Sequence, residues 1–156
     1  MKILYLHGWH AGVGGTKPTC LARHGYEVLN PPLSDNDFDE AVRAAQEAFD
    51  EGEPDLVVGS SRGGAVAMNI AIGACPLLLL CPAWKNWGNA TSITAGTLVL
   101  HGSEDEIIPF TDSEELVANS GLPAGALVAV RDNHRLGGSL PAMLSCVERL
   151  ASRQAD

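Results

Sequence analysis

Residues 55–66, DLVVGSSRGGAV, run from an apolar segment into two serines and a pair of glycines. The spacing Gly-x-Ser-x-Gly fits this stretch with Ser61 at its centre. Centring it on Ser60 would require glycine at the positions of Val58 and Arg62. That spacing is typical of a sharp strand-to-helix turn, which strains the serine backbone and needs tiny flanking residues so that the strand and the helix can approach each other. Ser61 is therefore the candidate nucleophile.

The apolar run before Ser61 is one of six along the chain, each ending in a small or turn-forming residue. Their hydrophobicity is nearly continuous, without alternation, which is typical of parallel strands that helices cover on both faces. The sequence therefore predicts a three-layer α/β/α sandwich with a parallel sheet of about six strands, in a single domain over residues 1–156. The predicted strands are 2–6, 26–30, 55–59, 77–81, 97–102 and 126–130.

Segments of helical character lie between these runs and have recognisable start signals. One of them opens with a capping box from Thr111 to Glu114. The connection 82–96, PAWKNWGNATSITAG, has no helical period and is too short for a lid domain. The predicted helices are 38–51, 62–73, 111–121 and 140–153.

Composition and charge exclude several classes of function. Ten Lys and Arg face 19 Asp and Glu, a formal net charge of -9, which disfavours binding to nucleic acid or to anionic lipid. The four cysteines are widely spaced, and the histidines have no metal-ligand spacing, so we expect neither a metal site nor a cofactor. The segment GVGGTKPT (12–19) lacks the phosphate-loop spacing and is interpreted as a flexible loop beside the site. With no signal peptide or membrane span, the sequence predicts a cytoplasmic protein.

Ligands of open parallel sheets bind at the carboxyl ends of the strands, so the residues that follow each strand matter most. SEDEIIP (103–109) follows the fifth run and RDNHRL (131–136) follows the sixth. A serine, an acid and a histidine thus occur at this edge in that chain order. His134 is the candidate base that would take the proton of Ser61. The other histidines have weaker claims; His7 and His101 are expected to hydrogen-bond neighbouring loops.

The segments YLHGW, VVGSSRGG, LVLHGSEDEIIP and DNHRL resemble those of the α/β-hydrolase superfamily, and most of all its short, lidless bacterial esterases of the YqiA type. The resemblance covers essentially the whole chain. It implies that Asp105 is the acid that orients the histidine, with Glu104 as the alternative. Asp132, although nearer to His134 in the sequence, is expected to cap the turn after the last strand. The resemblance also implies an oxyanion hole made by the backbone N–H groups of Trp9 and Arg62.

The function implied is a serine hydrolase that cleaves a small ester or thioester, with that small molecule as its partner and neither nucleic acid nor a membrane. The alternative is a non-catalytic protein that keeps this fold and binds a partner protein. Trp84, Trp87 and His10 are candidate substrate contacts, although the two tryptophans could equally hold the connection to the body of the protein. The Arg62 guanidinium is expected to pair with Glu104 or Asp132, or else to attract an acidic substrate.

Overall fold

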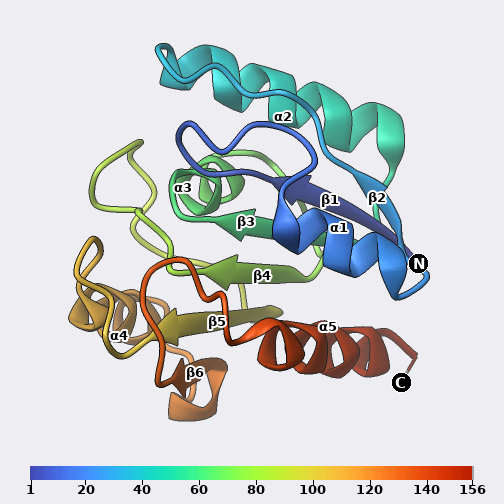
Figure 1. Ribbon diagram of the computed structural model, residues 1–156. Helices are drawn as coiled ribbons and strands as arrows, with labels where there is room; N and C mark the ends of the chain where they lie inside the picture. The colour runs from blue at the N-terminus through green and yellow to red at the C-terminus, as the bar shows by residue number, and fades with distance from the viewer. Residues whose placement is uncertain (156) are drawn as a thin grey trace.

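The computed structural model describes residues 1–155 and contains one parallel six-stranded sheet with the order β2-β1-β3-β4-β5-β6 (Figure 1). The predicted parallel sheet is confirmed, and each strand falls on one of the apolar runs. The strands are β1 (Lys2–Leu6), β2 (Glu27–Leu29), β3 (Leu56–Ser60), β4 (Leu77–Leu80), β5 (Thr97–Gly102) and β6 (Leu127–Val130).

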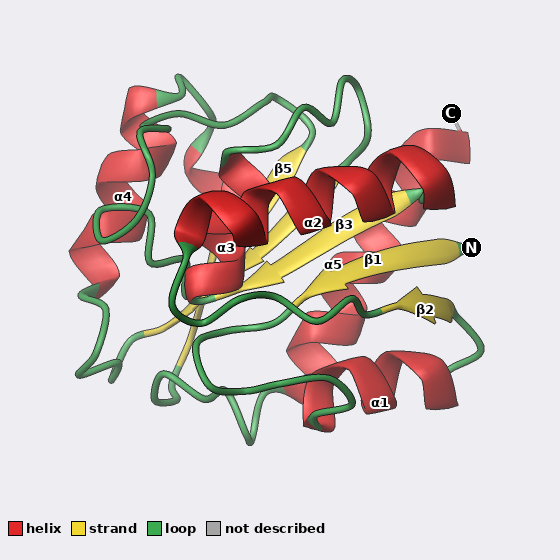
Figure 2. Cartoon of the chain, turned by 90° about the horizontal axis from the view of Figure 1, so that it is seen from above, coloured by secondary structure: helices red, strands yellow, loops and turns green. Residues whose placement is uncertain are grey.

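Helices cover both faces of the sheet, as the continuous hydrophobicity of the strands requires. On one face, α2, α3 and α4 pack on side chains such as Leu77 and Leu79; on the other, α1 and α5 pack on Leu78 and Leu80. Figure 2 shows α2 and α3 on one side of the strands and α1 on the other. The helices are α1 (Thr16–Arg23), α2 (Phe38–Gly52), α3 (Arg62–Met68), α4 (Phe110–Asn119) and α5 (Leu140–Ala155), with a short 3₁₀ turn η1 (Ala124–Ala126).

The strand register brings the ends of the central strands to a common edge. Leu6 at the end of β1 pairs with Gly59, and Ser60 at the end of β3 pairs with Leu80. At the other side of the sheet, Gly102 pairs with Val130. The loops that follow β1, β3, β5 and β6 therefore leave the sheet side by side, at the carboxyl edge where ligands of such sheets bind.

Three local predictions were wrong. The segment interpreted as a flexible loop contains the start of α1, which begins after Gly15 without a side-chain cap. No capping box forms at Thr111, because α4 begins one residue earlier, after Pro109. Finally, α3 stops at Met68 instead of continuing to residue 73.

The early end of α3 has a local cause. The Asn69 side chain donates to Ala65 O at 2.8 Å, which ends the helix, and its Oδ1 accepts from the amides of Asn89 and Ala90 at 3.2 and 3.3 Å. The same side chain therefore fastens the irregular connection 82–96 to α3. Within residues 1–155, no helix has both the length and the apolar character needed to span a membrane.

Candidate active site

Ser61 occupies a strained turn between β3 and α3. Its backbone has φ 55° and ψ -118°, a left-handed conformation that costs a non-glycine residue of order 1–3 kcal/mol. Hydrogen bonds on both sides hold the turn. The Ser61 N–H donates to Leu80 O at 2.9 Å, and Ser61 O accepts from the amides of Gly64 and Ala83 at 2.9 and 3.0 Å. The turn thus carries the Ser61 hydroxyl at the carboxyl edge of the sheet.

The flanking glycines are required by backbone packing. A Cβ on Gly59 would lie 2.6 Å from Gly63 O, and one on Gly63 would collide with Leu6 O of β1. These contacts leave no room for any side chain at either position. The predicted reason for the Gly-x-Ser-x-Gly spacing, the close approach of strand and helix, is therefore confirmed.

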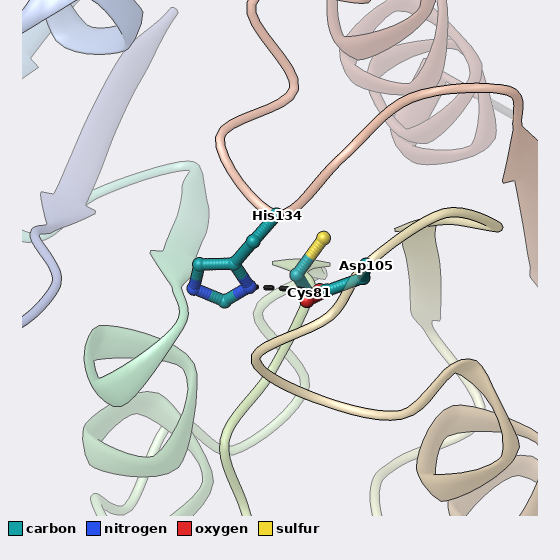
Figure 3. Close-up of side chains that lie close together, drawn as sticks. All are labelled: Cys81, Asp105 and His134. Carbon is teal, nitrogen blue, oxygen red and sulfur yellow. Dashed lines mark hydrogen bonds and ion pairs between the residues drawn. The ribbon is translucent and has the colours of Figure 1, made fainter.

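The structure brings together the three residues predicted to form a triad, from three different loops. Ser61 Oγ lies 2.8 Å from His134 Nε2. On the other side of the ring, His134 Nδ1 lies 2.7 Å from Asp105 Oδ2 (Figure 3). A carboxylate only accepts hydrogen bonds, so His134 donates from Nδ1, and its Nε2 is left to accept the Ser61 hydroxyl proton. This tautomer is the one that general-base catalysis needs.

Asp105 is held as a buried carboxylate. Its side chain is fully buried, and its Oδ1 accepts from the amides of Ile107 and Ile108 at 2.8 and 2.9 Å. Burial by itself would raise the pKa of Asp105, but the donors from Ile108, His134 and Ile107 outweigh it and hold the pKa below its usual range. Asp105 therefore stays charged and can stabilise a protonated His134.

The loop that carries His134 is pressed against the end of β5. A Cβ on Gly102 would collide with Asp132 O, and the Glu104 N–H donates to that same oxygen at 3.0 Å. Asp132 itself accepts from the Ser139 hydroxyl at 2.8 Å and from the Asn133 amide at 2.7 Å. It caps the turn after the last strand, as predicted.

Glu104, the alternative acid, lies away from His134. Its carboxylate receives Arg131 Nε at 3.1 Å, and both side chains are largely exposed. Of the two acids considered at this position in the sequence, only Asp105 contacts His134.

His101 is a contact of the acid that the sequence interpretation missed. Its Nε2 lies 3.1 Å from Asp105 Oδ2 and 2.9 Å from Ile108 O, while Ser113 Oγ lies 2.6 Å from its Nδ1. Burial lowers the pKa of His101, so the ring is neutral, with Nε2 as the donor and Ser113 donating to Nδ1. The available signal was the spacing of four residues to Asp105 at the end of a strand, where a loop can turn back on the histidine.

Cys81 is a second unpredicted neighbour of the triad. It is buried at the end of β4 with φ 43°, and burial raises the pKa of its thiol to about 12. Its Sγ and ligand atoms of Asp105 and His134 lie within 4.8 Å of one another (Figure 3). This is the group of described residues that comes nearest to a metal site, but two of its three members are already joined by the hydrogen bond of the triad.

The loop after β1 lies beside the nucleophile. A Cβ on Gly8 would be 3.4 Å from the Ser61 Cβ, so the backbone that leads to Trp9 passes close to the reacting serine. The Trp9 side chain is 54% exposed, stacks on His10 at 4.4 Å and meets Trp87 edge-on at 6.0 Å. These three aromatic side chains contact one another at the loop that passes Ser61, and we call them the aromatic rim.

Trp84 does not join this rim. It is 6% exposed, packs in the core between the sheet and α4, and donates from Nε1 to Asp112 O at 3.0 Å. Of the two tryptophans of the connection, Trp84 therefore holds the connection to the core, whereas Trp87 contacts Trp9 and the Arg62 guanidinium.

The predicted pairing of Arg62 with Glu104 or Asp132 was wrong. Both acids are engaged elsewhere, and the guanidinium carbon of Arg62 lies instead 5.5 Å from the ring centres of Phe38 and Trp87. Phe38 stands 24 positions before Arg62 in the chain and Trp87 stands 25 after it. No local sequence pattern relates residues so far apart.

No protein-family model matches the sequence, and no curated protein does either. Solved structures are similar over the whole chain. A putative hydrolase of the α/β superfamily from Xanthomonas campestris pv. campestris has a TM-score of 0.75 and 23% identity, covering 97% of this chain and 98% of its own. Est1E from Butyrivibrio proteoclasticus has a TM-score of 0.78 and 14% identity, covering 99% and 88%. The chain has the α/β-hydrolase fold.

A further solved structure with this hydrolase fold bears on the length of the connection 82–96. It is described as an α/β serine hydrolase without lid, from Xanthomonas campestris, and has a TM-score of 0.69 and 16% identity over 98% of this chain and 81% of its own. Its description agrees with the short connection 82–96 in the present chain.

Proposed function

We propose that the protein is a serine hydrolase that cleaves small esters or thioesters through an acyl-enzyme. The observation that carries the proposal is the continuous chain of hydrogen bonds Ser61 Oγ–His134 Nε2 at 2.8 Å and His134 Nδ1–Asp105 Oδ2 at 2.7 Å. A serine so placed has a base within reach of its proton, and the base is oriented by a buried carboxylate.

In the first half-reaction, His134 Nε2 takes the Ser61 proton while Oγ attacks the carbonyl carbon of the substrate. The oxyanion that forms is stabilised by the backbone N–H groups of Arg62 and Trp9. As the tetrahedral intermediate collapses, the bond to the leaving group breaks, and His134 gives its proton to the departing oxygen or sulfur. The products are an alcohol or thiol and an acyl group on Ser61.

In the second half-reaction, water replaces the leaving group. His134 takes a proton from the water, the hydroxide attacks the acyl carbonyl, and the second tetrahedral intermediate expels Ser61 Oγ, which recovers its proton from His134. The free acid leaves and the enzyme is restored. Asp105 remains ionised throughout and stabilises the protonated histidine.

Covalent labelling of Ser61 tests this function against the alternative of a non-catalytic partner-binding protein. A fluorophosphonate probe should react with the wild-type protein at Ser61, as located by peptide mass spectrometry, and p-nitrophenyl butyrate should be hydrolysed. Both reactions should vanish in Ser61→Ala, and His134→Ala should lose about as much turnover because the triad acts as a unit. Full ester hydrolysis by Ser61→Ala would refute the mechanism.

The third residue of the triad, Asp105, is tested by substitution, with the neighbouring Glu104 as the control. Asp105→Asn should lower kcat by about 10³-fold or more, since His134 would lose its orienting charge and its tautomer. Glu104→Gln removes a neighbouring carboxylate that pairs with the exposed Arg131 and not with His134, and it should leave kcat within about twofold. The reverse result would mean that the acid has been misassigned.

A further inference from the structure

The Arg62 guanidinium is a buried charge without an anion. The residue is 1% exposed, and its Nε is closed off from solvent with no hydrogen-bond partner. Among residues 1–155, no ion pair includes Arg62. A buried charge is normally paired, because removing it from water without compensation costs several kcal/mol. The fold itself therefore leaves this group in need of a negative partner.

The acids predicted to pair with Arg62 are engaged elsewhere. Glu104 binds Arg131, and Asp132 caps its own turn. Asp35 is the acid whose charge acts on Arg62, but its carboxylate accepts from the His10 amide at 3.0 Å and lies 3.2 Å from the His10 ring. None of these carboxylates forms an ion pair with the guanidinium.

The surroundings of Arg62 suit a ligand that brings its own anion. Phe38 and Trp87 contact the guanidinium as aromatic rings, each with 5.5 Å from the ring centre to the guanidinium carbon. Such contacts stabilise a cation without using its N–H donors, and because Nε is closed off, an anion would meet the guanidinium at its terminal Nη groups. Trp87 also meets Trp9 on the loop after β1, and Arg62 directly follows Ser61 in the chain, so the guanidinium lies on the same side of the site as this loop.

We propose that Arg62 binds a carboxylate on the acyl part of the substrate, so that the preferred substrates are esters or thioesters of small dicarboxylic acids with one carboxyl group free. The inference rests on the proposed function, since it places this carboxylate on the group that Ser61 would carry. A planar carboxylate matches the guanidinium fork with two parallel hydrogen bonds. A phosphate would bring more negative charge into a chain whose formal net charge is already -9.

Two ethyl esters of nearly the same shape test the preference. Ethyl hydrogen succinate carries the free carboxylate, and ethyl 4-methylpentanoate carries an isopropyl group in its place; proton release measures hydrolysis of both. The wild-type protein should prefer the succinate ester in kcat/KM by about 10- to 100-fold, the range expected for hydrogen bonds between charged groups. A ratio at or below one would overturn the proposal.

Variants then assign the preference to Arg62. Arg62→Gln keeps the backbone N–H that the oxyanion needs but loses the charge, so the ratio of the two kcat/KM values should fall to near one. The ratio is taken within each variant and so cancels any general loss of turnover. Arg131→Gln removes an equal charge from an exposed pair at the same edge and should keep the wild-type ratio. An unchanged ratio in Arg62→Gln would also overturn the proposal.

Binding of free succinate separates this inference from the proposed function. Succinate should raise the Tm of the wild-type and Ser61→Ala proteins, but not that of Arg62→Gln. If the fluorophosphonate probe fails to label Ser61 and neither ester is hydrolysed, the proposed function fails, and the rise in Tm with succinate still decides the role of Arg62.

A second variant covers the case in which Arg62→Gln does not fold. Arg62→Lys keeps the charge without the fork, so it should show a reduced preference for the succinate ester and a smaller rise in Tm with succinate. If succinate raised the Tm of whichever Arg62 variant folds by as much as it raises that of the wild-type protein, the carboxylate would not be bound by Arg62.

Discussion

Both carboxylate oxygens of Asp105 are engaged, and their partners explain the different roles of His101 and His134. Two backbone amides occupy Oδ1, while Oδ2 faces both His134 and His101. His101 is wholly buried and linked to Ser113, so it is a fixed donor to the carboxylate. His134 is partly exposed and reaches Ser61. Asp105 thus contacts two histidines with different roles. His101 holds the carboxylate in position, and His134 would transfer protons.

The neutral state of His101 predicts a pH dependence of stability. Burial lowers its pKa below the ordinary value of 6.5, so below that pH the unfolded chain binds a proton at this residue that the folded chain does not. Folding stability should therefore fall as the pH is lowered through 6.5 towards the folded pKa. The loss of Tm between about pH 7 and pH 5 should be smaller in His101→Asn than in the wild-type protein. Equal losses in the two proteins would show that His101 is not kept neutral by the fold.

At the scale of elements, the β3–α3 turn depends on how closely three backbones approach. A Cβ on Gly63 would meet the carbonyl oxygens of Leu6 and His7, and these belong to β1 and its following loop. The contact is with backbone, which cannot move aside as a flexible side chain would. The turn that strains Ser61 is therefore fixed by the neighbouring strand as well as by its own sequence.

Gly63→Ala should consequently lower the free energy of unfolding by about 2–4 kcal/mol, as strand and helix are forced apart. Gly125→Ala is the matched control, because its Cβ would enter open space without a left-handed φ, and the change should stay within about 0.5 kcal/mol. Denaturant titration of both variants measures the difference. Equal stabilities would mean that β1 does not constrain the turn.

The sequence predicted the sheet because burial on both faces makes the inner strands continuously apolar, and the edge strands β2 and β6, although only partly buried, are also short apolar runs. It did not predict α1, since this helix starts after glycines, lacks a side-chain cap and has Pro18 in its first turn. The three triad residues could be named because each follows a strand within a recognisable motif. The position of the Arg62 guanidinium could not, because it depends on Phe38 and Trp87, which only the folded chain brings together.

At the scale of the whole molecule, the connection 82–96 lies on the body of the protein instead of covering the serine. The Trp84 indole holds its beginning to α4. Its later part is fastened by the Asn119 side chain, which donates to Thr91 O at 3.1 Å, and by Ser120 Oγ, which accepts the Ile93 amide at 2.9 Å. Among the described residues, the aromatic rim is therefore the apolar group that we expect to shield an acyl group on Ser61.

This arrangement predicts a limit on the length of neutral acyl chains. Each methylene that the rim buries should contribute about 0.8 kcal/mol, roughly a fourfold gain in kcat/KM, while methylenes beyond the rim stay in water and contribute nothing. With p-nitrophenyl esters, kcat/KM should rise from acetyl to butyryl and then level off or fall. Trp87→Ala should flatten the rise, because its ring forms one wall of the rim, whereas Trp84→Ala should preserve the rise while lowering Tm. A steady increase up to palmitoyl esters would instead require a deep acyl channel, and the fastened connection would then have to open during catalysis.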